Sequence, residues 1–197
     1  MNRSFSLAGL ALATILTNAG FAANPQAPAS AQKPTFASEY EKQLTDVQKD
    51  VEGAAAAMPE DKFNFAPTGP GDFKGVRTFA MQVKHMAVAN YALGAAILQE
   101  KPPVALKGPN GPDNITSRAD ILKFLHESFD YAHKALAGIN ETNVLEPIKA
   151  PFGPDQTTRL SVATDILAHP FDHYGQMVIY LRMNGIIPPA SRPAPKK

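Results

Sequence analysis

The sequence predicts an all-α protein, a bundle of four amphipathic helices, and two observations lead to this fold class. Apolar residues recur at every third or fourth position in four separate stretches, and glycine or proline closes each stretch. No stretch shows the strict alternation of apolar and polar residues that indicates a half-buried strand. Long connections separate the helices, so the periodicity alone leaves the order of packing open.

The first helix is expected over residues 38–58. Ser38 is the expected N-cap because Glu41 follows three residues later. Pro59 ends the helix, and its apolar face consists of Leu44, Val47, Val51 and Ala54. Four consecutive alanines precede Met58. They favour close packing against another helix, and a homodimer face would explain them equally well.

Three further helices follow the same rules. The second is expected over residues 78–99 and ends before Pro102, and the third lies between the cap Ser117 and Gly138. The fourth is expected to begin within residues 157–161 and to end at Asn184 and Gly185. The spacing of four methionines fits apolar packing faces, so we expect them in the core: Met81, Met86, Met177 and Met183.

The ends of the chain are expected to lie outside the folded domain. Arg3, the apolar run of residues 7–16 and the small residues around Ala22 predict a signal peptide over residues 1–22. Residues 23–34 are rich in Ala and Pro and predict a flexible leader. The domain is then expected over residues 35–192, with a short tail over residues 193–197. We therefore expect an exported protein, periplasmic or extracellular, without a membrane anchor after signal cleavage.

The charge balance and the absence of cysteine exclude several classes of partner and metal ligand. Arg3 is one of 19 basic residues, so cleavage would leave 18 basic and 18 acidic residues. This balance argues against nucleic acid or an anionic membrane as the partner. The chain has no cysteine, so it contains neither disulfides nor thiolate ligands, and a site for a borderline metal must use histidine.

Three of the five histidines are candidates for a metal site. His169 and His173 are four residues apart, so both imidazoles project from one face of the fourth helix. His85 lies on the apolar face of the second helix, where it is either a third ligand or a core histidine bonded to a backbone carbonyl. His126 and His133 lie among charged residues and are expected to be ordinary helix-face side chains.

Two blocks of sequence resemble the DinB-like superfamily. The first is MPEDKFNFAP at residues 58–67, followed by VRTF at 76–79, His85 and Asn90-Tyr91. The second is HPFDHYGQ at residues 169–176, followed by YLR at 180–182 and NGIIPP at 184–189. The resemblance implies an up-down-down-up four-helix bundle with long connections, and a metal site formed by His85, His169 and His173. Pro170 departs from a regular helix and is expected to kink it between two ligands.

The chemistry implied by this resemblance is that of a divalent transition metal. Three neutral imidazoles bind Zn²⁺, Ni²⁺ or Fe²⁺ and leave one or more coordination positions open. Residues one turn away would orient the ligands, and the candidates are Asp165, Gln176 and, at the edge of the pocket, Tyr180. Nothing in the sequence marks a particular catalytic residue.

The sequence is compatible with three functions. The first is a metal-dependent hydrolase or thiol transferase acting on a small molecule, although export would separate the protein from cytoplasmic thiols. The second is a non-catalytic or stress-related bundle in which the metal is structural. The third is an interaction module without metal that uses its proline-rich loops.

Overall fold

The computed structural model describes residues 33–68, 74–153 and 155–193. The expected signal peptide and most of the expected leader and tail lie outside this range. The main elements are α1 (Phe36–Ala57), α2 (Phe79–Leu98), α3 (Arg118–Ala137) and α4 (Arg159–Met183). Two short strands, β1 (Pro147–Lys149) and β2 (Gln156–Thr158), and two 3₁₀ turns, η1 (Glu60–Lys62) and η2 (Pro189–Ser191), complete them.

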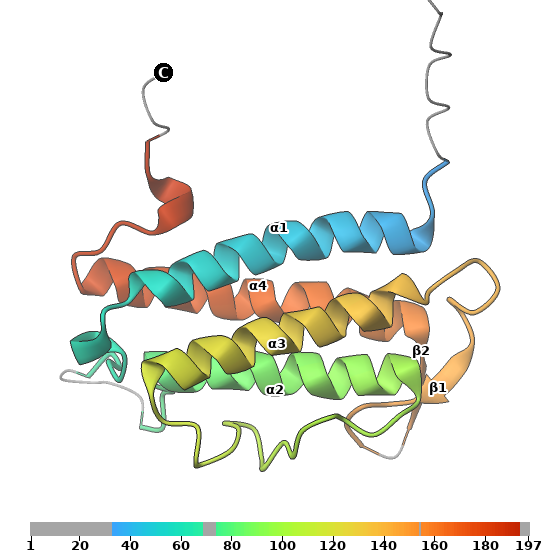
Figure 1. Ribbon diagram of the computed structural model, residues 1–197, viewed down its shortest axis with the longest axis horizontal. Helices are drawn as coiled ribbons and strands as arrows, with labels where there is room; N and C mark the ends of the chain where they lie inside the picture. The colour runs from blue at the N-terminus through green and yellow to red at the C-terminus, as the bar shows by residue number, and fades with distance from the viewer. Residues whose placement is uncertain (1–32, 69–73, 154, 194–197) are drawn as a thin grey trace, which may run out of the picture. The chain divides into compact units, whose positions relative to one another are not determined.

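The four helices form an up-down-down-up bundle, as predicted (Figure 1). Helices α1 and α4 run in one direction, and α2 and α3 run in the other. Each of α1 and α2 packs against both α3 and α4. Because α2 and α3 are parallel, the segment between them must return along the whole length of the bundle (Figure 1). Residues 99–117 form this return segment.

Each helix begins at a hydroxyl cap. Thr78, Ser117 and Thr158 accept backbone N–H groups at the starts of α2, α3 and α4. The predicted cap of α1 was wrong by three residues, because Thr35 is the N-cap. The hydroxyl of Thr35 accepts from the backbone N–H of Ser38, and the hydroxyl of Ser38, at the third helical position, accepts from the backbone N–H of Thr35. The two residues form a reciprocal capping box with Ser38 in the place expected for a glutamate.

Apolar residues from all four helices fill the core. Ala54 and Ala55 are fully buried, so packing within the chain accounts for these two members of the alanine run. Met86 and Met177 are also fully buried, as expected, whereas Met81 and Met183 are exposed and their predicted core position was wrong. Among the described residues no helix is both long and apolar enough to span a membrane.

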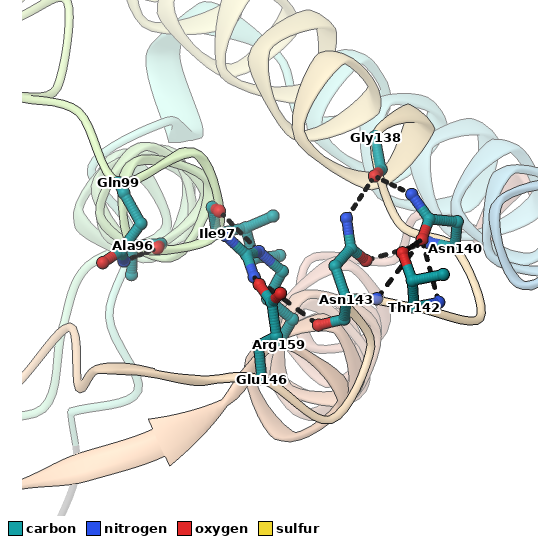
Figure 2. A network of polar contacts seen from close by, with 9 residues as sticks. All are labelled: Ala96, Ile97, Gln99, Gly138, Asn140, Thr142, Asn143, Glu146 and Arg159. Atoms are coloured by element: carbon teal, nitrogen blue, oxygen red, sulfur yellow. Dashed lines mark hydrogen bonds and ion pairs between the residues drawn. The ribbon is translucent and has the colours of Figure 1, made fainter.

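A two-stranded antiparallel hairpin of β1 and β2 precedes α4 and was not predicted. Each strand has three residues, too few to show a period of two in the sequence. Arg159, the first residue of α4, donates to the carbonyl of Ile97 at the end of α2 and to Glu146 before the hairpin (Figure 2). The start of α4 is therefore fixed against the end of α2.

Candidate metal centre

Three imidazole rings from two helices meet between α2 and α4. Nε2 of His169 lies 3.2 Å from Nε2 of His85 and 3.2 Å from Nε2 of His173. One ring nitrogen from each of the three lies within 4.8 Å of the others. His173 is buried, and His85 and His169 are half-buried. The structure therefore brings together all three histidines that the sequence nominated.

The nitrogen spacing fits a metal ion. Three nitrogens at roughly 2.1 Å from one ion lie about 3.4 Å apart in a tetrahedral arrangement and about 3.0 Å apart in an octahedral one. The two Nε2–Nε2 distances of 3.2 Å fall between these values. The ring nitrogens of the third pair, His85 and His173, lie within 4.8 Å of each other, so all three rings are close enough to be gathered around one ion.

Hydrogen bonds at the outer nitrogens fix two of the rings. Nδ1 of His85 lies 2.6 Å from the carbonyl oxygen of Pro109, which can only accept a hydrogen bond. Nδ1 of His85 must therefore carry the hydrogen, and its Nε2 presents a lone pair to the centre. A ligating histidine is typically held in this way by a carbonyl or carboxylate.

A chain of side-chain amides fixes His173 in the same tautomer. Asp172 accepts from Nε2 of Gln176, Oε1 of Gln176 accepts from Nε2 of Gln82, and Oε1 of Gln82 lies 2.6 Å from Nδ1 of His173. An ionised carboxylate can only accept, so Asp172 sets the direction of every bond in this chain. The Nδ1 of His173 donates, and its Nε2 is left free for a metal.

The site also favours the neutral form of the imidazoles. The pKa values of His169 and His173 are lowered to about 4, mainly by burial and in smaller part by the neighbouring histidines. Burial lowers the pKa of His85 as well, against the opposing effect of its bond to Pro109. Because metal ligands must be deprotonated, the three rings are ready to bind metal at neutral pH.

The return segment before α3 supplies the oxygen that orients His85. Two long side chains near the start of α2 hold this segment: Lys84 donates to the carbonyl of Pro112, and Arg77 donates to Asn110. Gly111 has a φ of +77°, which glycine adopts without strain. The glycine- and proline-rich stretch predicts only a connection between helices, and its sequence carries no signal for the role of Pro109.

The three residues expected to surround the ligands have different positions. Gln176 belongs to the amide chain but reaches His173 only through Gln82. Asp165 is exposed and lies in the wall of a cavity beside His169. The hydroxyl of Tyr180 donates to the carbonyl of Arg77, 3.1 Å away, and so contacts the backbone before α2.

Gln82 and Asp172 were not predicted as part of the site. Gln82 lies three residues before His85, so both side chains project from one face of α2, and its 2% exposure is low for a polar residue. That spacing was a usable signal for Gln82. Asp172 adjoins His173 in the sequence, and its role depends on the conformation of Gln176, which helical spacing cannot predict.

Helix α4 is continuous through Pro170, which is buried between His169 and His173. Proline has no N–H, so the carbonyl of Ile166 receives no helical hydrogen bond from it. The rings of His169 and His173 nevertheless lie 4.5 Å apart, centroid to centroid. Pro170 is therefore compatible with convergence of the two imidazoles.

The other two histidines lie elsewhere, as expected. His126 contacts Glu52, and His133 contacts Gln48 and Glu41, all on α1. These contacts join α3 to α1, on the side of the bundle formed by those two helices.

Comparisons with known proteins agree with the fold and identify the family. The family model of the DinB superfamily matches residues 43–177, and the chain belongs to this superfamily. A comparison with curated proteins finds no match. Among solved structures, the crystal structure of a DinB-like protein from Bacillus cereus ATCC 10987 aligns with a TM-score of 0.60 and 14% identity. The alignment covers 79% of this chain and 96% of that chain, and at this identity it supports the fold alone.

Proposed function

We propose that the chain is an exported metal-binding member of the DinB superfamily, in which His85, His169 and His173 hold a divalent transition ion such as Zn²⁺, Ni²⁺ or Fe²⁺. We further propose that it is a metal-dependent hydrolase or transferase acting on a small molecule. The observation that supports this is the convergence of three Nε2 atoms, two of them on rings whose outer nitrogens are already bonded.

A divalent ion bound here would lower the pKa of a water molecule or thiol and would polarise a carbonyl group. The protein's own residues contribute position and environment. Pro109 and Gln82 orient two rings, and burial keeps the imidazoles neutral. A cavity of about 450 Å³ beside His85 and His169 offers space for a substrate within reach of the ion.

Metal content of the untagged protein tests the first part of this proposal. We expect one equivalent of a divalent transition ion by elemental analysis, and loss of that ion in His173→Ala. His126→Ala is the matched control, because it removes a histidine on another face of the bundle. Failure of the wild-type protein to retain metal after incubation with zinc, nickel or iron would contradict the proposal.

Turnover tests the second part. We expect hydrolysis of an ester or amide, or transfer of a thiol to an electrophile, that is lost on chelation and in His85→Ala. Activity that persists at the wild-type rate in the His85 variant with metal removed would show that the reaction takes place elsewhere.

A structural role for the metal is the second candidate, because the ligands join α2 to α4. An ion at a free concentration one hundred times its Kd would stabilise the fold by about 2.7 kcal/mol. Under this alternative, metal removal lowers the melting temperature and no substrate class gives turnover.

Export rests on the pattern of residues 1–22, with its positive start, apolar run and small residues before the expected cleavage site. Fusion of these residues to a reporter that is active only outside the cytoplasm tests it. We expect reporter activity, and its loss when Leu10 and Leu12 are changed to arginine.

A further inference from the structure

The cavity beside the three histidines has an apolar wall with one carboxylate. Val88, Ala89 and Leu93 line it from α2, and Phe152 lines it from the hairpin loop. His85 and His169 form its metal-binding end, so a molecule inside would lie next to the proposed ion. Its volume of about 450 Å³ is in the range of small-molecule sites.

The charge of the cavity wall selects against anions. Asp165 lies in the wall one turn before His169, and no lysine or arginine lines the cavity among the described residues. Within the same described ranges, Asp165 forms no ion pair. A carboxylate without a cation partner favours a ligand that supplies one.

We propose that the substrate of this site is a small apolar molecule with an amino group, with the ammonium on Asp165, the apolar body against Val88 and Leu93, and the reactive end toward His85 and His169. The reactive end rests on the proposed function, whereas the amine preference depends only on the cavity. A thiol substrate that carries free carboxylates fits poorly, because no lysine or arginine in the cavity wall would pair with those carboxylates.

Calorimetric titration of the full chain with three matched probes tests this inference: 4-phenylbutylamine, 4-phenylbutanol and 4-phenylbutyrate. In the metal-free protein we expect the amine to bind about fivefold more tightly than the alcohol, and the carboxylate to bind most weakly. Asp165→Asn should abolish the amine preference. Asp46→Asn, which removes an exposed carboxylate from α1, should preserve it.

The outcomes separate the two proposals. An amine preference in a protein that binds no metal would overturn the proposed function and support this inference. Equal affinity for amine and carboxylate, no binding of any probe, or a preference that survives Asp165→Asn would overturn this inference and leave the metal proposal standing.

A different face of α4 carries a second inference. Three large apolar side chains lie exposed along it, Phe171 at 49%, Ile179 at 55% and Met183 at 57%. Gly175 lies between them, and a Cβ added there would meet no atom within 4 Å, so the helix surface has an open notch. These residues follow the helical repeat and form one continuous line, which we call the α4 stripe.

The α4 stripe is complementary to itself. Exposed Asp172 lies near one end and exposed Arg182 near the other. If two α4 helices pack antiparallel about a two-fold axis at residue 177, each Asp172 faces Arg182 of the second copy, and each Ile179 faces the notch at Gly175. Phe171 then lies opposite Met183. An isologous interface requires such reciprocal pairs.

We infer that the α4 stripe binds a second copy of this chain. A single helix face is at the small end of stable interfaces, so we expect a dimer of micromolar affinity. Sedimentation at increasing protein concentration should show the dimer, and Ile179→Asp should abolish it. Wild-type protein that stays monomeric at every concentration would overturn the inference.

Charge reversal gives a sharper test. Asp172→Arg and Arg182→Asp alone each place like charges opposite one another and should be monomeric, whereas an equimolar mixture restores both ion pairs and should form heterodimers. Glu127→Lys on α3 is the control and should dimerise like wild type. Circular dichroism confirms that each variant is folded, and wild-type-like homodimers of either reversal variant would refute this geometry.

Discussion

Replacing Gln82 by leucine is expected to weaken divalent metal binding by a factor of about 10 to 100. The oxygen of Gln82 lies 2.6 Å from Nδ1 of His173 and is the acceptor that fixes the tautomer of this ring. Leucine has a similar volume but accepts no hydrogen bond, so the imidazole can rotate or exchange tautomers. Nε2 then points at the metal position for only part of the time.

The expected loss of affinity can also be stated as a free energy. A loss of 10- to 100-fold in affinity corresponds to about 1.4 to 2.7 kcal/mol. Leaving a buried donor such as Nδ1 of His173 without a partner costs about 1 to 3 kcal/mol. The two figures are of the same order, and the loss reduces metal affinity to the extent that the metal-bound state depends more on the bond that orients His173.

Competition with a chromophoric zinc chelator measures the effect on the wild type and on Gln82→Leu. Gln82→Glu is the matched control: its carboxylate can still accept from His173 but cannot donate to Gln176, so affinity should stay close to wild type or increase. Thermal melts of the metal-free variants show whether both are folded. A Gln82→Leu affinity within twofold of wild type would refute the reasoning.

Three other expectations concern stability. In the metal-free protein the pKa values of His169 and His173 fall from 6.5 to about 4 on folding, so between these values the unfolded chain binds protons that the folded chain does not. The free energy of unfolding should therefore decrease as pH falls from 6.5 toward 4, and thermal melts of the double alanine variant should show a flatter dependence. Gly94→Ala places a Cβ 2.9 Å from the buried ring of Tyr131. We expect the free energy of unfolding, measured in urea, to fall by about 1 kcal/mol. A more stable variant would show that the ring moves freely. Arg159→Met removes the guanidinium that ties α4 to the end of α2 and should cost about 1 to 3 kcal/mol in the same assay, with an unchanged midpoint contradicting the anchoring role.

The fold was predictable because helical periodicity and caps are local properties. The expected spans of α2, α3 and α4 agree with the structure to within one or two residues. The cap of α1 was misplaced because Ser38 and Thr35 both have hydroxyls at suitable spacing. The hairpin before α4 was missed because strands of three residues carry no measurable pattern.

The sequence by itself determined the helices, and helical spacing put His169 and His173 on one face of α4. The spacing left His85 open as a ligand or a core histidine, and only the resemblance to the DinB-like superfamily named it as the third member of the site. Only the tertiary structure decided what surrounds them. Pro109 reaches His85 because parallel helices α2 and α3 force a long return segment across the bundle. Gln82 reaches His173 because α2 packs against α4. These contacts join residues distant in the sequence, and local spacing contains no information about which distant atoms meet.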